Sequence, residues 1–270
     1  MYLGRLFAKA DQLQPDLLGC ERTMCRMIAI VGDPPLEKSD LLLKFRCLSA
    51  CGNVRTGASF GHEHGWGILS YRDNSPKYLG RSTEPAWKSP EYMVACEKVT
   101  NTDRIVLAHL RKASSGTISL ENTQPLISGK WSFGHNGTVY SPAFNTGTVQ
   151  SDSRTVLDRL VRAIDKSGPM PIERVIAKNV QRIREDILRD PDRKGRTYSS
   201  LTFMLSNGES LYVLRDFTEE EDYYTMYYYV VPNGAVFCQE KIWSAPWKPL
   251  ENRKLATVNQ EGRVLIDACE

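Results

Sequence analysis

Apolar and polar positions follow strand-like and helix-like periods in turn along the first half of the chain. An apolar run at Met27–Val31 stops at Gly32, as expected of a buried strand that ends in a turn. Apolar residues then recur every three or four positions, which predicts a helix over Leu36–Ala50. The same criteria predict a strand, a helix and another strand over Gly65–Arg72, Ser89–Val99 and Arg104–Arg111.

The second half of the chain is predicted to contain two helices followed by strands. Two short strands are expected on either side of the Asn136-Gly137 pair, and helices over Ser151–Ile164 and Pro171–Leu188. Five strands should follow, over Ser199–Asn207, Glu209–Phe217, Thr225–Pro232, Ala235–Gln239 and Arg263–Ala268. Strands, two central helices and then strands indicate an α+β fold. Because no glycine-rich phosphate loop follows a strand, a Rossmann or P-loop protein is disfavoured.

Composition excludes several classes of protein. The 270 residues are 41% hydrophobic and 25% charged, as in a folded chain of one or two domains. Basic and acidic residues number 35 and 32 and are intermixed, so no nucleic-acid footprint is present. No segment has the roughly 18 consecutive apolar residues that a membrane span needs. We therefore expect no nucleic-acid partner and no membrane insertion.

The seven cysteines indicate a reducing environment. Their number is odd, their spacing forms no disulfide framework, and charges interrupt the start of the chain where a signal peptide would need an apolar segment. We therefore expect a cytoplasmic protein with free thiols.

Cys25 and the Asn136-Gly137 pair are the first candidates for chemistry. If translation begins at Met24, removal of that methionine leaves Cys25 with a free α-amine, which can act as the base for its own thiol. The plain alternative is a buried cysteine at the start of a strand. Asn136-Gly137 is either a hairpin turn or, through a side-chain amide and an adjacent backbone N–H, an oxyanion hole.

Two charged residues are candidates for binding a substrate. Arg111 ends an apolar strand, where it could simply reach solvent or could bind a carboxylate with its planar guanidinium. Asp152 lies where a helix cap belongs, yet a carboxylate in a cleft could also hold an ammonium group. His62 and His64 alternate as two metal ligands would, but no partner has a recognisable spacing, so no metal is expected.

Six motifs occur together in one order: Met24-Cys25-Arg26, HGWGI, AHLRKASSG, ENTQP, FGHNGTV and SDSR. This order resembles the class II glutamine amidotransferases, which are N-terminal-nucleophile hydrolases, and most of all their stand-alone members. The likeness is clear from Cys25 to Asp165 and continues beyond by strand order and length. It implies a four-layer αββα sandwich of two mostly antiparallel sheets.

The resemblance also implies a role for each candidate residue. Cys25 would be the nucleophile, and Asn136 and Gly137 would form the oxyanion hole. The substrate would be held by Arg111 and Ser114 at its α-carboxylate and by Asp152 at its α-ammonium. Lys112 and Ser115 stand where many relatives have an aromatic residue and a histidine, which bears on selectivity. No metal or organic cofactor is implied.

The implied reaction releases ammonia or an amine and glutamate from glutamine, or from a γ-glutamyl amide, through a γ-glutamyl thioester on Cys25. The ammonia could pass to a separate synthase subunit. Two alternatives stay open, a γ-glutamyl peptide hydrolase and a non-catalytic glutamine-sensing subunit. Residues 25–270 would form a single domain, and residues 1–24 an extension that is a misassigned start or a cleaved propeptide.

Overall fold

The computed structural model describes residues 25–54, 61–73, 75–144, 149–191, 195 and 197–269, so the expected extension over residues 1–24 lies outside the described residues. The helices are α1 (Lys38–Arg46), α2 (Leu48–Cys51), α3 (Pro90–Glu97), η3 (Leu120–Asn122, a 3₁₀ turn), α4 (Asp152–Asp165) and α5 (Ile172–Arg189). The strands are β1 (Arg26–Gly32), β2 (Trp66–Arg72), β3 (Ser75–Ser82), β4 (Ile105–Leu110), β5 (Leu126–Ser128), β6 (Trp131–Asn136), β7 (Thr202–Ser206), β8 (Ser210–Arg215), β9 (Tyr227–Val231), β10 (Gly234–Cys238), β11 (Lys248–Pro249), β12 (Lys254–Asn259) and β13 (Val264–Ala268).

The strands form two antiparallel sheets. The first has the order β11-β9-β10-β1-β4-β2-β3 and the second β13-β12-β8-β7-β6-β5. Strand β1 lies in the middle of the first sheet, where Arg26 pairs with Leu110 of β4 and Ile28 with Cys238 of β10. The first described residue, Cys25, therefore enters a strand that is held on both edges.

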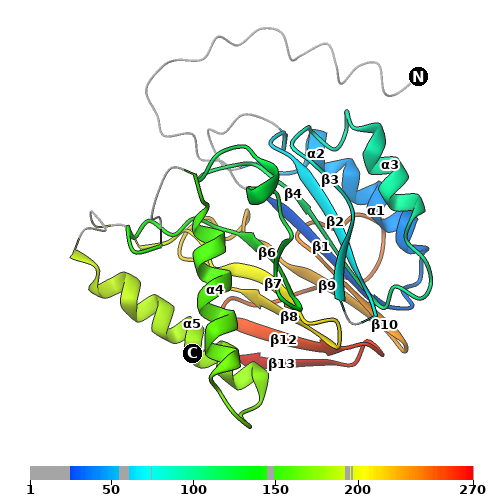
Figure 1. Ribbon diagram of the computed structural model, residues 1–270. Coiled ribbons are helices and arrows are strands. Elements are labelled where there is room, and N and C mark those ends of the chain that lie inside the picture. The colour runs from blue at the N-terminus through cyan, green and yellow to red at the C-terminus, as the bar shows by residue number, and fades with distance from the viewer. Residues whose placement is uncertain are drawn as a thin grey trace, which may run out of the picture.

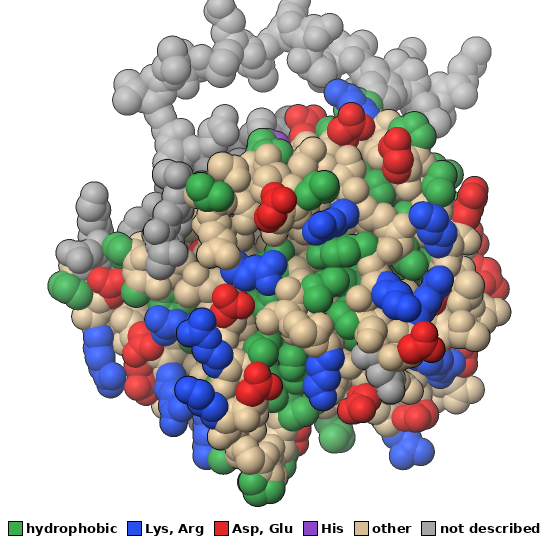
Figure 2. All heavy atoms as spheres, viewed as in Figure 1, with side chains coloured by type: hydrophobic (Ala, Val, Ile, Leu, Met, Phe, Trp, Pro, Cys, Tyr) green, Lys and Arg blue, Asp and Glu red, His purple; other side chains and the backbone are tan. Residues whose placement is uncertain are grey.

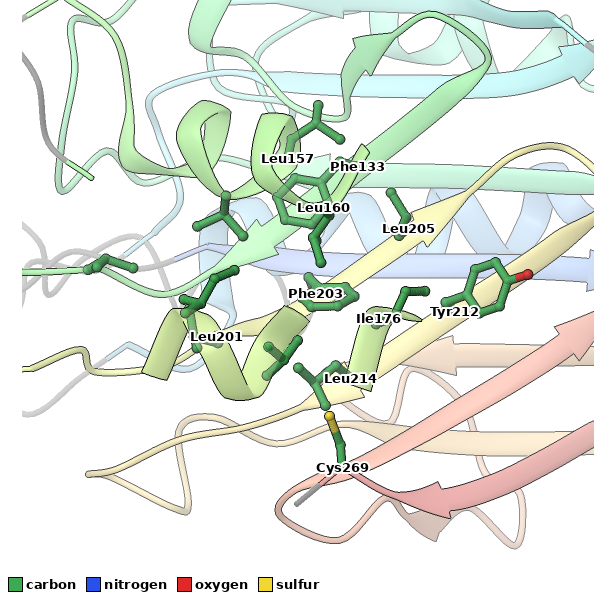
Figure 3. Close-up of a cluster of buried hydrophobic side chains, with 14 of the residues drawn as sticks. Phe133, Leu157, Leu160, Ile176, Leu201, Phe203, Leu205, Tyr212, Leu214 and Cys269 are labelled. Carbon is green, nitrogen blue, oxygen red and sulfur yellow. The ribbon is translucent and has the colours of Figure 1, made fainter. Parts of the chain in front are cut away.

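Three apolar clusters separate four layers of structure. One lies between the two sheets, and one lies between the first sheet and helices α1 and α3. The third lies between the second sheet and helices α4 and α5, where Phe133 and Phe203 meet Leu157 and Leu160 (Figure 3). Figure 1 shows helices α1 to α3 on one side of the sheets and α4 and α5 on the other. The expected α+β fold, a four-layer αββα sandwich, is confirmed.

Most predicted elements are present, with several local differences. The helix predicted over Leu36–Ala50 breaks at Cys47 into α1 and α2, and strands β3, β5, β11 and β12 were not expected. The second of the two short strands expected around Asn136-Gly137 does not form. Strand β6 ends at Asn136, its hairpin partner is β5, and Val139 makes only an isolated bridge to Tyr198. An Asn-Gly pair favours a tight turn, but here the backbone of a distant segment packs against it.

The surface carries both signs of charge, and the described cysteines are free thiols. Figure 2 shows Lys and Arg side chains interspersed with Asp and Glu on the face in view. Cys25, Cys96, Cys238 and Cys269 are buried, whereas Cys47 and Cys51 are exposed, and none of these six forms a disulfide. Among the helices of the described segments, none is long and apolar enough to cross a membrane.

Candidate functional site

Asn136 binds the main chain of Cys25 on both sides. The Cys25 backbone N–H donates to Asn136 Oδ1 at 3.1 Å, and Asn136 Nδ2 donates to the Cys25 carbonyl oxygen at 2.9 Å. Cys25 precedes β1 in the first sheet, and Asn136 ends β6 in the second. The two residues come from opposite sheets, and their paired hydrogen bonds bring the predicted nucleophile and one predicted oxyanion donor together.

The Cys25 thiol is buried among charged groups. The residue is 8% exposed, and the Lys112 backbone N–H lies 3.4 Å from Sγ. Burial raises the pKa of the thiol to about 11, while the Lys112 N–H and the guanidinium groups of Arg111 and Arg26 act in the opposite direction. The Asp152 carboxylate adds to the increase. At neutral pH, this thiol therefore needs a base to become a nucleophile.

Gly137 follows the end of β6 and lies against the backbone of another segment. A Cβ atom at this position would be 1.8 Å from the Ser200 carbonyl oxygen and 2.9 Å from His135 Nε2. Real Cβ atoms do not approach a backbone oxygen this closely, so only glycine fits. The absence of a side chain also leaves the backbone beside Asn136 open to close approach.

Arg111 lies directly after β4, and its side chain is buried. Its guanidinium donates to the Thr117 carbonyl at 3.1 Å and to the Ser115 carbonyl at 3.2 Å. Burial lowers the pKa of Arg111, and the nearby carboxylate of Asp152 works against this change. A buried guanidinium that donates to neutral carbonyls still carries a full positive charge, which an anion could neutralise.

Asp152 is the first residue of α4, and Ser151, rather than Asp152, is the helix cap. Its Oδ1 accepts from Ser115 Oγ at 2.7 Å, and its Oδ2 accepts from the Val139 N–H at 2.7 Å. The carboxylate also benefits from the positive end of the helix dipole. Ser115 therefore links the two predicted binding residues, because its hydroxyl reaches Asp152 while its carbonyl holds Arg111.

Ser114 lies at the exposed edge of this group. Its hydroxyl is 2.7 Å from Thr138 Oγ1, next to Gly137 in the chain. All six predicted site residues therefore lie in one connected region, in two groups. Cys25 and Asn136 form the first, Arg111 and Asp152 form the second, and the segments that carry Ser114 and Gly137 connect them.

Two histidines behind the site, His109 and His135, are buried core residues. His135 Nδ1 lies 2.9 Å from Ser153 Oγ, and Nε2 lies 3.2 Å from the Ser200 carbonyl. Because a carbonyl only accepts, Nε2 carries a proton, and burial lowers the pKa of His135, which favours the neutral ring. His109 Nε2 likewise faces the His135 carbonyl at 3.3 Å. Across the described ranges, no three His, Cys, Asp or Glu side chains gather as metal ligands would.

The burial of His109 predicts acid sensitivity. Burial lowers its pKa to about 3. An unfolded histidine titrates near pH 6.5, so the stabilising preference for the neutral ring is complete above that pH and is lost as the pH falls towards 3. Between pH 7 and pH 5, His109 should cost about 2 kcal/mol of unfolding free energy. Urea unfolding of His109→Gln should show a pH dependence smaller by that amount, and an unchanged dependence would contradict this prediction.

Sequence reasoning missed four residues around Cys25, which are Arg26, Tyr223, Gln239 and Glu240. Tyr223 and Arg26 donate to the Cys25 carbonyl, Gln239 accepts from Asn136, and Glu240 binds Arg26. A usable signal existed for Arg26, since it is a charge at the start of a run predicted to be buried. The other three lie about 200 residues away in the chain, and nothing in their spacing points to Cys25.

Similarity to known proteins agrees with this arrangement. The family described as glutamine amidotransferases class II matches residues 24–232. A Haemophilus influenzae protein is 25% identical over 199 residues, which make up 70% of this chain and 62% of that protein. YafJ of Escherichia coli (strain K12) is 29% identical over 121 residues, 43% of this chain and 44% of that protein. Both carry provisional names as glutamine amidotransferases, and the match spans less than two thirds of either.

Solved structures share the fold at low identity. A "glutamine aminotransferase class-II domain protein" from Silicibacter pomeroyi superposes with a TM-score of 0.60 at 18% identity, over 91% of this chain and all of that one. The glutamine phosphoribosylpyrophosphate amidotransferase of B. subtilis has a TM-score of 0.59 at 15% identity, over 91% of this chain and 49% of that one. The fold expected of N-terminal-nucleophile hydrolases is thus confirmed, and with a family match over well more than half of its length the chain belongs to the class II glutamine amidotransferases, a family of enzymes.

Proposed function

We propose that this protein hydrolyses the side-chain amide of glutamine through a γ-glutamyl thioester on Cys25, releasing ammonia and glutamate. The observation that carries this proposal is the pair of hydrogen bonds between Asn136 and the main chain of Cys25, at 3.1 and 2.9 Å. These two hydrogen bonds hold the Asn136 side-chain amide next to the residue that carries both the thiol and the proposed base. Family membership supplies the substrate class.

The reaction begins with proton transfer from the thiol. The free α-amine of Cys25, which requires that residues 1–24 be absent from the working enzyme, takes the proton, directly or through a water. Sγ then bonds to the amide carbon, and the carbonyl electrons move to the oxygen. Asn136 and the Gly137 N–H stabilise this oxyanion, each by about 3 kcal/mol. The ammonium returns its proton to the leaving nitrogen, the C–N bond breaks, and water hydrolyses the remaining thioester.

Arg111 and Asp152 recognise the amino-acid end of the substrate in this proposal. The buried Arg111 guanidinium would bind the α-carboxylate, with Ser114 assisting, and Asp152 would bind the α-ammonium. Ser115 already connects the two binding groups. The spacing between this pair and Cys25 would place the side-chain amide carbon of glutamine, rather than its α-carboxylate carbon, at the sulfur, and this positioning contributes to rate as well as to affinity.

Arg111→Lys tests this recognition. Lysine keeps the charge but loses the planar pair of donors, so KM for glutamine should rise roughly 30-fold, with a smaller change in kcat. Arg104→Lys is the matched control, since Arg104 stands just before the opposite end of β4 and bonds Asp33 and the Gln260 carbonyl. An unchanged KM in Arg111→Lys would remove the carboxylate role.

The decisive experiment concerns the start of the chain. Protein initiated at Met24 should have an intact mass corresponding to residues 25–270, the single domain proposed here, and should release ammonia from glutamine. Protein that retains residues 1–24 should be inactive, because its Cys25 nitrogen is a peptide nitrogen. Activity in the retained form would contradict the proposed base.

Two substrate classes are separated by the same assay. A γ-glutamyl dipeptide presents the same head group to Arg111 and Asp152, so the Met24-initiated protein should be assayed with it alongside glutamine. In the ammonia-donor proposal, a synthase subunit takes the product. A kcat/KM for the dipeptide comparable to that for glutamine would contradict this proposal and would indicate a γ-glutamyl peptide hydrolase. Glutamine binding without any release would indicate a sensing subunit instead.

A further inference from the structure

The Cys25 carbonyl oxygen accepts hydrogen bonds from three different side chains. Asn136 Nδ2 and Arg26 Nη1 each donate at 2.9 Å, and the Tyr223 hydroxyl donates at 3.3 Å. A carbonyl oxygen has two lone pairs, so three donors are one more than it needs. The three donors come from β1, from β6 and from the loop before β9, and thus from both sheets.

Both hydrogens of the Asn136 side-chain amide, by contrast, are already used in hydrogen bonds. Its Nδ2 carries two hydrogens and already faces two acceptors, the Cys25 carbonyl at 2.9 Å and Gln239 Oε1 at 3.1 Å. An oxyanion that forms next to Asn136 must therefore take a hydrogen away from one of them. Gln239 is fully buried and its Oε1 accepts from Asn136 Nδ2, so withdrawing that hydrogen bond would deprive a buried acceptor of this donor at considerable cost.

We infer that Tyr223 and Arg26 are positioning residues that allow Asn136 to transfer one hydrogen bond from the Cys25 carbonyl to the oxyanion. When that hydrogen leaves, the carbonyl keeps two donors, which matches its two lone pairs. Gln239 holds the second hydrogen and thereby keeps the Asn136 amide in its orientation. This inference rests on the proposed function, because the exchange matters only if an oxyanion forms at Asn136.

Both residues are held firmly enough for this role. The Arg26 side chain is fully buried, with Nε on the Glu240 carboxylate and Nη2 on the Asn53 carbonyl, and its guanidinium lies over the Tyr223 ring at 4.2 Å from the centroid. The Arg26 guanidinium and the Tyr223 ring therefore hold one another in place next to the Cys25 carbonyl.

Arg215 fixes the loop that presents Tyr223. This residue ends β8 and donates to the carbonyl oxygens of Glu221 at 3.2 Å, Tyr224 at 2.7 Å and Leu250 at 2.9 Å. The carbonyls on both sides of Tyr223 are thus tied to the second sheet, while its hydroxyl reaches the first residue of the first sheet. Such a span across the sandwich has no evident purpose for packing alone.

Tyr223→Phe in the Met24-initiated protein tests the inference. The ring and its contact with Arg26 remain, and only the hydroxyl is lost. Because the missing donor is needed after Asn136 has turned to the oxyanion, kcat should fall on the order of tenfold with KM within twofold of wild type. Alkylation of Cys25 by iodoacetamide, followed by peptide mass spectrometry, forms no oxyanion and should proceed at the wild-type rate.

Tyr92→Phe is the matched control. It removes another buried tyrosine hydroxyl that donates to a carbonyl, that of Leu42 at 2.9 Å, in the helix layer outside the site. Its melting temperature should fall as in Tyr223→Phe, with kcat unchanged. Arg26→Lys gives a second measurement, since lysine cannot hold all the partners at once. Its kcat should fall by at least tenfold, again with alkylation unchanged.

The outcomes separate the inference from the proposed function. If the wild-type Met24-initiated protein with a verified free amine releases no ammonia, the proposed function fails. If wild type is active and Tyr223→Phe matches Tyr92→Phe in kcat, the inference is overturned. It is also overturned if alkylation slows and KM rises together with the loss of kcat, because that pattern means Tyr223 only supports the local structure.

Discussion

Cys25→Ala in the Met24-initiated protein is expected to abolish ammonia release, with kcat/KM lower by a factor on the order of 10⁴ or more. The methyl side chain leaves the α-amine and the hydrogen bonds of Asn136 in place, so only the nucleophile is lost. Because the thiol is buried, the change should also cost about 1 kcal/mol of stability and no more. Continuous measurement of ammonia, with glutamate as an independent product, checks the loss of activity, and urea unfolding checks the change in stability.

The exposed cysteines provide the control for this variant. Cys47 and Cys51 are solvent-accessible, and their thiols donate to the backbone carbonyls of Leu43 and Cys47, four residues earlier in each case. Replacing both by alanine should leave kcat and KM unchanged. If Cys25→Ala kept more than about one per cent of wild-type kcat/KM, covalent catalysis at Cys25 would be untenable.

Gly137→Ala is expected to disrupt both the fold and the reaction. A Cβ atom would lie 1.8 Å from the Ser200 carbonyl oxygen, so the segment carrying Ser200 must move away from the end of β6. That movement also disturbs His135, whose Nε2 bonds the same carbonyl. We expect the free energy of unfolding to fall by about 3 kcal/mol or more, with loss of most activity in the fraction that folds.

Gly134→Ala is the matched control, three residues earlier and within strand β6. There the nearest atom to a new Cβ is the Met27 Sδ at 3.3 Å, the tip of a flexible side chain. Chemical denaturation of the two variants should show a much smaller loss for Gly134→Ala. Equal losses would mean that the close backbone approach at Gly137 is not what requires a glycine.

The elements that a single-sequence pattern predicts here are those with a clear period. Strand β1 and helices α4 and α5 follow from uninterrupted apolar runs and three- and four-residue spacing. Strand β3 was missed because its residues SPKYLGRS contain a proline, a glycine and two charges. Strand β3 lies at the edge of the first sheet and pairs only with β2. An edge strand faces solvent on its unpaired side, so it needs no apolar run.

The candidate site was predicted only through the order of its motifs. Each of these residues, taken alone, is as well explained by an ordinary structural role, and for Asn136-Gly137 a hairpin turn stood as the alternative to an oxyanion hole. What brings Tyr223 and Gln239 beneath Cys25 is pairing between segments about 200 residues apart. The period of a strand carries no information about which distant strand will pair with it.

The central place of β1 has a consequence for how the enzyme matures. Strand β1 is synthesised first, but one of its two neighbours, β10, lies more than 200 residues later, beyond the segment that matches the family. A chain still attached to the ribosome therefore has its first strand open on one side and Arg26 without Glu240. Only when β10 and the residues after it have joined the sheet do Gln239 and Glu240 reach Asn136 and Arg26, so the surroundings of Cys25 are completed late in synthesis.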